Sequence, residues 1–85
     1  MFSREQFGQR LKQLRKSCGE TQSDLGEILG VYKTQISEIE KGNASTTLEK
    51  LVLICQHYHV SSDYLLGLQD APLGNEEEKE TAHEA

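Results

Sequence analysis

The segment that most constrains the fold of this chain covers residues 21–42, with the sequence TQSDLGEILGVYKTQISEIEKG. An apolar stripe at helical spacing precedes a glycine, and a second stripe follows after a short interval. The first stripe comprises Leu25, Ile28 and Leu29, the glycine is Gly30, and the second stripe comprises Ile36 and Ile39. Helices this short are marginal alone, so we expect them to pack against each other across a tight turn, crossing at roughly 90–120°.

Capping residues and a small residue favour the same arrangement. Thr21 and Asp24 have the spacing of a capping box, which predicts a helix that starts at residue 22. Gly26 lacks a side chain, so it would let the second helix approach closely. The segment therefore predicts helices over residues 22–29 and 33–41, with Gly42 ending the second.

A further helix is predicted before this segment. Ser3 and Gln6 have capping spacing, and apolar residues follow at intervals of three and four up to residue 18. Gly19 then ends a first helix over about residues 4–18.

Two more helices are predicted after it. Thr46 and Glu49 have the spacing of a capping box and should start the fourth helix, which we expect to be the most buried. Its broad apolar face comprises Leu48, Leu51, Val52, Ile54, Cys55 and Tyr58. Ser61 is a predicted N-cap for a short fifth helix that ends at Gly67. With 85 residues, the chain supports one small all-α domain.

The charge of the chain is unevenly distributed. Residues 1–68 carry eight Lys or Arg and eight Asp or Glu, whereas residues 69–85 carry one lysine against six acidic residues. The net charge of −5 is therefore entirely in the C-terminal segment. Because that segment has almost nothing apolar to bury, we expect residues 69–85 to form a flexible, disordered acidic tail.

Several classes of protein are disfavoured. No apolar run reaches the ~18 residues of a membrane span, and the N-terminus has no apolar signal core, so we expect a cytoplasmic protein. Cys18 and Cys55 continue apolar stripes, which favours buried free thiols over a disulfide. His57 and His59 lie two residues apart and point in different directions on a helix, so they are not expected to bind a metal. No cofactor is expected.

The pattern resembles the Cro/cI type of helix-turn-helix repressor, also called the Xre family, over about residues 7–67. The resemblance rests on Thr21, Gln22, Leu25, Gly30, Val31, Ile36, Ser37, Ile39, Glu40, Gly42, Leu48, Leu51, Val60 and Ser61. It implies a compact five-helix bundle of the lambda-repressor-like DNA-binding type. The DNA-binding domain would span residues 7–67, with its helix-turn-helix at residues 22–41.

This resemblance implies a sequence-specific transcriptional regulator, in particular a repressor, that inserts the helix at residues 33–41 into the major groove. The expected DNA contacts are Gln22, Tyr32, Lys33, Thr34, Gln35, Ser37, Glu38, Lys41 and Asn43. Lysine suits guanine and glutamine suits adenine at the start of this helix, whereas the loop after it would reach phosphates. The resemblance also implies a salt bridge between Arg15 and Glu40.

Three residues depart from the family pattern. Tyr32 stands where Ser or Thr usually caps the third helix, and its phenol is not expected to reach the N–H groups of that helix. Glu38 stands where Arg, Lys or Gln is frequent, so it either specifies a cytosine or lowers affinity. His59 replaces a helix-ending glycine, and we expect it to adopt the left-handed conformation.

The expected partner is double-stranded DNA carrying a palindromic operator, bound by a homodimer because one such domain reads few base pairs. Apolar residues at the end of the bundle would either complete the core or form the dimer surface: Tyr58, Tyr64, Leu65, Leu66 and Leu68. The alternative is a protein-interaction module, an antitoxin or antirepressor, whose acidic tail binds a protein partner. An enzyme is the weakest hypothesis, since no nucleophile faces a base and no glycine-rich phosphate loop is present.

Overall fold

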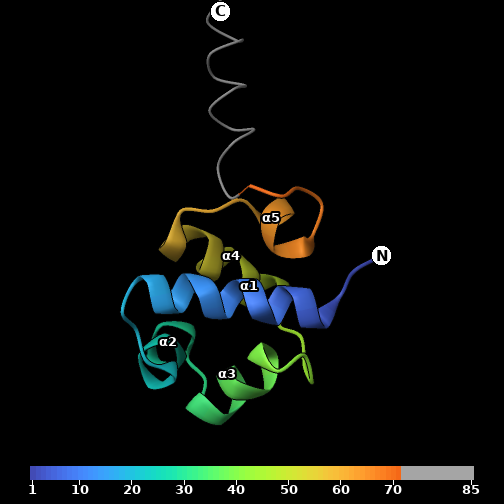
Figure 1. Cartoon of the computed structure of the whole chain (residues 1–85). Coiled ribbons are helices and arrows are strands. Elements are labelled where there is room, and N and C mark those ends of the chain that lie inside the picture. Colours follow the sequence, from blue (N-terminus) through green and yellow to red (C-terminus); the bar gives the residue numbers. More distant parts are fainter. Residues whose placement is uncertain (72–85) are drawn as a thin grey trace, which may run out of the picture.

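The computed structural model describes residues 1–71, which form five helices without any strand. The helices are α1 (Arg4–Ser17), α2 (Gln22–Leu29), α3 (Lys33–Glu40), α4 (Leu48–Tyr58) and α5 (Ser62–Leu66). Helix α1 crosses the middle of the bundle, with α2 and α3 on one side and α4 and α5 on the other (Figure 1). The predicted all-α, five-helix architecture is confirmed for these residues.

The ends of α2 follow from local signals. Asp24 N–H donates to Thr21 Oγ1 over 3.0 Å, and Thr21 N–H donates to the Asp24 carboxylate over 2.9 Å, so the predicted capping box is formed. Gly30 ends the helix in the left-handed conformation, with φ of 75°. His59 also adopts this conformation at the end of α4, with φ of 58°, as expected from its sequence position.

The predicted start of α4 is wrong by one residue. Thr47, not Thr46, is the N-cap, and its hydroxyl accepts a hydrogen bond of 3.2 Å from Lys50 N–H. Ala44 and Thr46 are partly buried where the loop packs against the core, so the chain stays extended as far as Thr47. The Thr46–Glu49 spacing therefore matched a capping box that the tertiary packing does not use.

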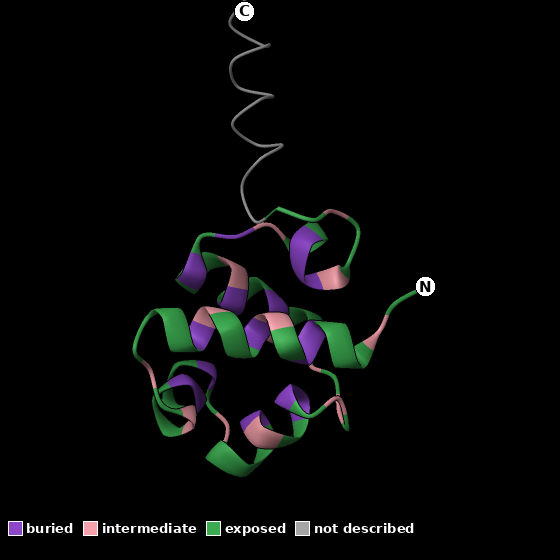
Figure 2. Ribbon diagram, viewed as in Figure 1, coloured by how far each residue is buried: buried purple, intermediate pink, exposed green. Residues whose placement is uncertain are grey.

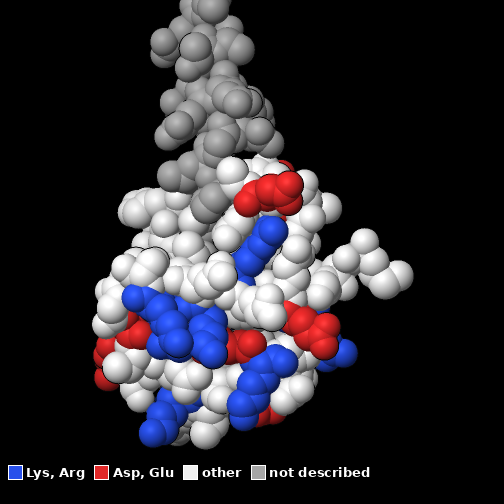
Figure 3. All heavy atoms as spheres, viewed as in Figure 1, with Lys and Arg blue, Asp and Glu red and all other residues white. Residues whose placement is uncertain are grey.

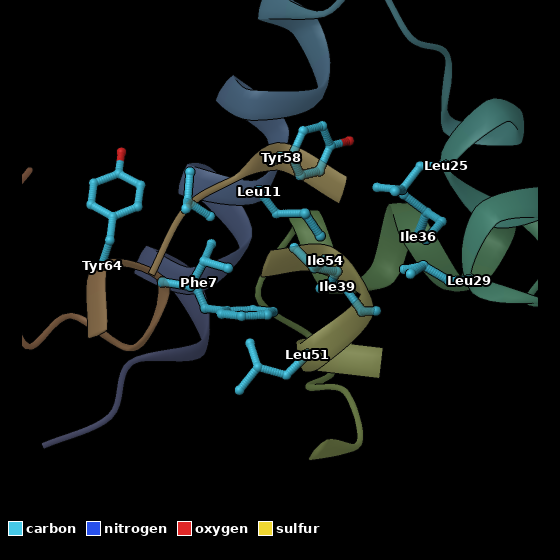
Figure 4. Close-up of a cluster of buried hydrophobic side chains, with 12 residues drawn as sticks. Phe7, Leu11, Leu25, Leu29, Ile36, Ile39, Leu51, Ile54, Tyr58 and Tyr64 are labelled. Carbon is cyan, nitrogen blue, oxygen red and sulfur yellow. The ribbon is translucent and has the colours of Figure 1, made fainter. Parts of the chain in front are cut away.

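The hydrophobic core lies where the five helices meet (Figures 2 and 4). It comprises Phe7, Leu11, Leu25, Leu29, Ile36, Ile39, Leu51, Ile54, Tyr58, Val60, Tyr64 and Leu65. Helix α4 contributes one narrow stripe to this core and is not the most buried helix, contrary to expectation. Leu48 and Val52 are 80% and 53% exposed, because a helix of three turns cannot turn six apolar side chains toward a single neighbour.

Two other expectations of burial are also wrong. Ile28 is 38% exposed, since α2 buries only the side that carries Leu25 and Leu29. Cys18 is exposed because it follows the last turn of α1, whereas Cys55 is half-buried. The two cysteines are not joined to each other in a disulfide.

The end of the bundle near α5 is mainly core. Tyr58, Tyr64 and Leu65 are buried, whereas Leu66 is half-buried and Leu68 is 73% exposed. Most of these residues therefore complete the core, and few of them are exposed enough to form a dimer surface.

The first residues of the expected tail lie against this end. The Arg10 guanidinium stands 4.3 Å from the centre of the Tyr64 ring and donates to the Gln69 carbonyl over 3.0 Å. It also lies 4.0 Å from the Asp70 carboxylate. Most of the expected acidic tail, residues 72–85, lies outside the described residues. Within residues 1–71, no helix is long and apolar enough to cross a membrane.

Candidate nucleic-acid interface

Helix α3 presents a polar face to solvent. Ile36 and Ile39 are 0% and 1% exposed and point into the core, and Glu40 beside them is also buried. The predicted base-reading residues Lys33, Thr34, Gln35 and Glu38 are exposed, and Ser37 is half-buried. Exposed residues line the outer side of α3 in Figure 2. The structure therefore brings these predicted site residues together on one accessible helix face.

Two glycines set the position of α3. A Cβ atom on Gly26 of α2 would lie 2.6 Å from the Val31 carbonyl oxygen, so the expected close approach at this turn is confirmed. A Cβ atom on Gly8 of α1 would lie 2.8 Å from the Glu40 carbonyl oxygen, at the other end of α3. The sequence reasoning missed Gly8, although a glycine inside an otherwise regular helix often indicates close packing.

A buried ion pair joins α1 to α3. Arg15 Nε donates to Glu40 Oε2 over 2.6 Å, and Arg15 Nη2 donates to Glu40 Oε1 over 3.0 Å. Hydrogen bonding to Glu40 raises the pKa of Arg15. Arg15 Nη1 also donates to the Glu20 carbonyl over 2.7 Å, so one guanidinium connects α1, the loop before α2 and the end of α3.

Gln22, at the start of α2, joins the same group. Its Nε2 donates to Glu40 Oε1 over 3.1 Å, which leaves the side chain half-buried and fixed in orientation. Glu40 therefore accepts hydrogen bonds from both α1 and α2. One buried carboxylate on α3 therefore links α3 to both of the preceding helices.

A second carboxylate, Glu20, connects the motif to α4 and was missed by the sequence reasoning. Tyr58 Oη donates to Glu20 Oε1 over 2.6 Å, and His57 Nε2 lies 2.5 Å from Glu20 Oε2. Burial, together with the hydrogen bond to Glu20, raises the pKa of Tyr58 above its usual range. No local sequence signal relates Glu20 to partners 37 and 38 residues away.

The loop after α3 has a defined geometry. Gly42 has φ of 84°, and its N–H donates to the Ile39 carbonyl over 3.0 Å. Asn43 N–H donates to the Glu38 carbonyl over 2.9 Å. This pair of bonds is a Schellman motif, which fixes where Lys41 and Asn43 project beyond the helix.

The charged side chains around α3 are mixed in sign. In Figure 3, Lys and Arg side chains gather over the part of the surface formed by α1, α2 and α3, with acidic side chains among them.

Tyr32 is the N-cap of α3 and makes no side-chain hydrogen bond to that helix, as expected for a phenol. Within residues 1–71, no group of three or more His, Cys, Asp or Glu side chains is placed to hold a metal ion.

Comparison with known proteins gives a consistent assignment of the motif. A helix-turn-helix family (HTH_3) matches residues 11–65. An HTH-type transcriptional regulator of Bacillus subtilis, YobD, is 41% identical over 66 residues, which are 78% of this chain and 59% of the relative. The antitoxin PezA of Streptococcus pneumoniae is 33% identical over 61 residues, which are 72% of this chain and 39% of that protein.

A solved structure shares the fold. The P22 c2 repressor, in complex with a synthetic operator, is 32% identical and superposes with a TM-score of 0.67. The match covers 71% of this chain and 91% of the repressor chain in that structure. By contrast, the chain spans just over half of the length of the curated regulator that it resembles.

Proposed function

This chain belongs to the helix-turn-helix family, and from that premise we propose that it is a sequence-specific DNA-binding transcriptional regulator that acts as a repressor. The observation that carries the proposal is the outer face of α3, which is polar, exposed and opposite the buried Ile36 and Ile39. The relatives' names as transcriptional regulators, and the operator bound by the P22 c2 repressor, support the same function.

In this proposal, α3 lies in the major groove, where base edges differ in their donors and acceptors. Lys33 donates to guanine, Gln35 pairs with adenine, and Thr34 contacts a thymine methyl group or a phosphate. Ser37 and Glu38 complete the reading face, and Tyr32 stands beside it near the DNA backbone.

Phosphate contacts would flank the reading helix. Gln22 lies in the first turn of α2, where the helix N-terminus also favours an anion. Lys41 and Asn43 project from the fixed turn after α3. Such contacts position a protein on DNA and do not themselves read the bases.

We further propose that two copies bind a palindromic operator, with half-sites about 34–36 Å apart. A single α3 reads only a few base pairs, so a homodimer supplies the remaining specificity.

A protein-interaction module remains the second candidate, and the similarity to the antitoxin PezA favours it. In that case a protein partner would bind the acidic segment at residues 69–85, most of which lies beyond the described residues. Neither candidate gives the chain an enzymatic activity.

Selection of bound DNA from a random pool by the full chain tests the proposal. We expect enrichment of a palindromic site with fixed half-site spacing. Gln35→Ala should relax the selected sequence at one position per half-site, whereas Gln56→Ala, an exposed glutamine on α4, should leave it unchanged. No enrichment above background, with the folded protein present, would reject DNA reading and favour the interaction module.

A further inference from the structure

The Glu38 carboxylate contacts both side chains that we assign to phosphate binding after α3. Asn43 Nδ2 donates to Glu38 Oε1 over 3.3 Å, and Lys41 Nζ lies 3.8 Å from Glu38 Oε2. Each carboxylate oxygen therefore has its own partner. The two donors that would meet a DNA phosphate already face an anion in the free protein.

The backbone brings these groups together. Asn43 N–H donates to the Glu38 carbonyl over 2.9 Å, so the turn at Gly42 folds the chain back over the last turn of α3. Lys41 follows Glu38 by three residues, which places both on one side of the helix. The contact is therefore a consequence of the helix end and does not depend on a distant element.

The contact is also open to exchange. The Glu38 and Lys41 side chains are 49% and 63% exposed, and pairs this exposed contribute little to stability. A phosphate offers the same anionic oxygen acceptors to an ammonium and an amide as a carboxylate does. An incoming phosphate can therefore replace Glu38 without any change in the fold.

We propose that Glu38 occupies the phosphate site of the free protein as an internal anion, and that a DNA phosphate displaces it. This inference rests on the proposed DNA-binding function. The displaced carboxylate then faces the major groove, where an amino group, such as N4 of cytosine, offers it a new donor. Glu38 thereby makes the phosphate contact of Lys41 and Asn43 depend on the base sequence.

On DNA without an amino group at that position, the carboxylate gains no new partner. It either stays on Lys41 and Asn43, so the phosphate contact is not made, or it remains unpaired close to the phosphates. Both outcomes lower affinity for the wrong sequence, which is specificity obtained through repulsion. Glu38 is therefore a specificity-determining residue whose main effect is on non-specific DNA.

The substitution Glu38→Gln tests this role. We expect affinity for random-sequence DNA to rise roughly three- to ten-fold, with a smaller rise or a fall in affinity for the selected site. The ratio of the affinity for the selected site to that for random-sequence DNA should therefore decrease. Asp63→Asn is the matched control, because it removes one negative charge from α5, at the far side of the bundle from α3 (Figure 1). An equal change at both kinds of DNA, or a change equal to that of the control, would overturn the inference.

Lys41→Ala in both backgrounds gives a second readout. On random-sequence DNA we expect this substitution to lower the slope of log affinity against log salt by about 0.9 in the Glu38→Gln protein, and by clearly less in the native background. Equal slope changes in the two backgrounds would show that Glu38 does not restrain Lys41.

Titration with inorganic phosphate separates this inference from the proposed function. Followed by NMR at the Asn43 side-chain amide, phosphate should bind Glu38→Gln more tightly than the native chain or Asp63→Asn. If the native chain binds no DNA, the proposed function fails, and the titration still decides whether Glu38 occupies the site. Equal phosphate binding by all three proteins would overturn the inference.

Discussion

Arg15 and Glu40 form a buried ion pair between α1 and α3, in which 8% and 3% of the two side chains are exposed. Glu40 also accepts a hydrogen bond from Gln22, and Arg15 donates to the Glu20 carbonyl. The reading helix is therefore held by charge-assisted hydrogen bonds as well as by the apolar contacts of Ile36 and Ile39. Removing one partner would leave the other buried without a counter-charge.

Glu40→Gln should lower the free energy of unfolding by about 3–5 kcal/mol, the usual cost of breaking a buried pair on one side. Urea unfolding monitored by circular dichroism measures this loss, and operator affinity should fall with it because α3 loses its anchor. Glu27→Gln, at an exposed position on α2, makes the same charge change as a control. Unchanged stability and DNA binding in Glu40→Gln would leave the pair without a role.

The raised pKa of Tyr58 predicts that the folded protein loses stability at high pH. Its pKa is raised in the folded protein, first by burial and then by the hydrogen bond to Glu20, so the folded state holds the phenolic proton more tightly than the unfolded chain. This contribution is complete below pH ~10, where both states are protonated, and decreases above it as the unfolded chain ionises. The free energy of unfolding should fall by up to about 1.4 kcal/mol per pH unit from this group.

Unfolding curves between about pH 9 and 11.5 test the assignment. Tyr58→Phe should reduce the slope of stability against pH, while Tyr64→Phe, which keeps the Tyr58–Glu20 hydrogen bond, should retain it. Identical slopes in the two variants would assign the alkaline loss to other groups.

Gly8→Ala should destabilise the protein despite the better helix propensity of alanine. Alanine gains about 0.5–1 kcal/mol in a helix interior, but its Cβ would lie 2.8 Å from the Glu40 carbonyl oxygen. That oxygen belongs to the backbone of α3 and cannot rotate away, so overpacking of about 1–3 kcal/mol should prevail. Thermal unfolding measures the net effect, and DNA affinity reports displacement of α3.

Gln9→Ala is the control for Gly8→Ala, because Gln9 is the exposed neighbour on the same helix. It should leave stability nearly unchanged or raise it. A Gly8→Ala protein as stable as Gln9→Ala, with native DNA affinity, would contradict the close approach of α1 and α3.

The motif helices were predictable because their signals are local. Thr21 with Asp24 starts α2 and Gly30 ends it, and these residues lie within one short segment of the chain. The start of α4 was misassigned because Thr46 and Thr47 can both serve as an N-cap, and the packing of the loop selects Thr47 although Thr46 has the capping-box spacing.

The contacts between helices that hold the site in place were less predictable. The Arg15–Glu40 pair followed from family resemblance, whereas the Glu20 contacts with His57 and Tyr58 join residues far apart in sequence. Gly8 shows the same limit, since its role depends on the carbonyl groups that end another helix. Local patterns thus indicate where helices begin and end, but not which polar groups meet between them.

Tyr32 leaves the start of α3 without a side-chain cap, although the residue occupies the N-cap position and is 85% exposed. Tyr32→Ser should therefore stabilise the free protein by about 0.5–2 kcal/mol relative to Tyr32→Ala, because a serine hydroxyl can accept from the first-turn N–H groups. Urea unfolding of the two variants measures this difference. Equal stability would show that the uncapped helix end carries no cost.

The same variants test whether the tyrosine serves DNA binding. If its phenol contacts the DNA backbone, Tyr32→Ser should be more stable than the native chain and yet bind the operator more weakly, with a similar loss for Tyr32→Ala. Tyr32→Phe then separates a hydrogen bond from stacking, since it keeps the ring and removes the hydroxyl. Native affinity in all three variants would exclude a DNA contact and would leave the missing cap without compensation at this position.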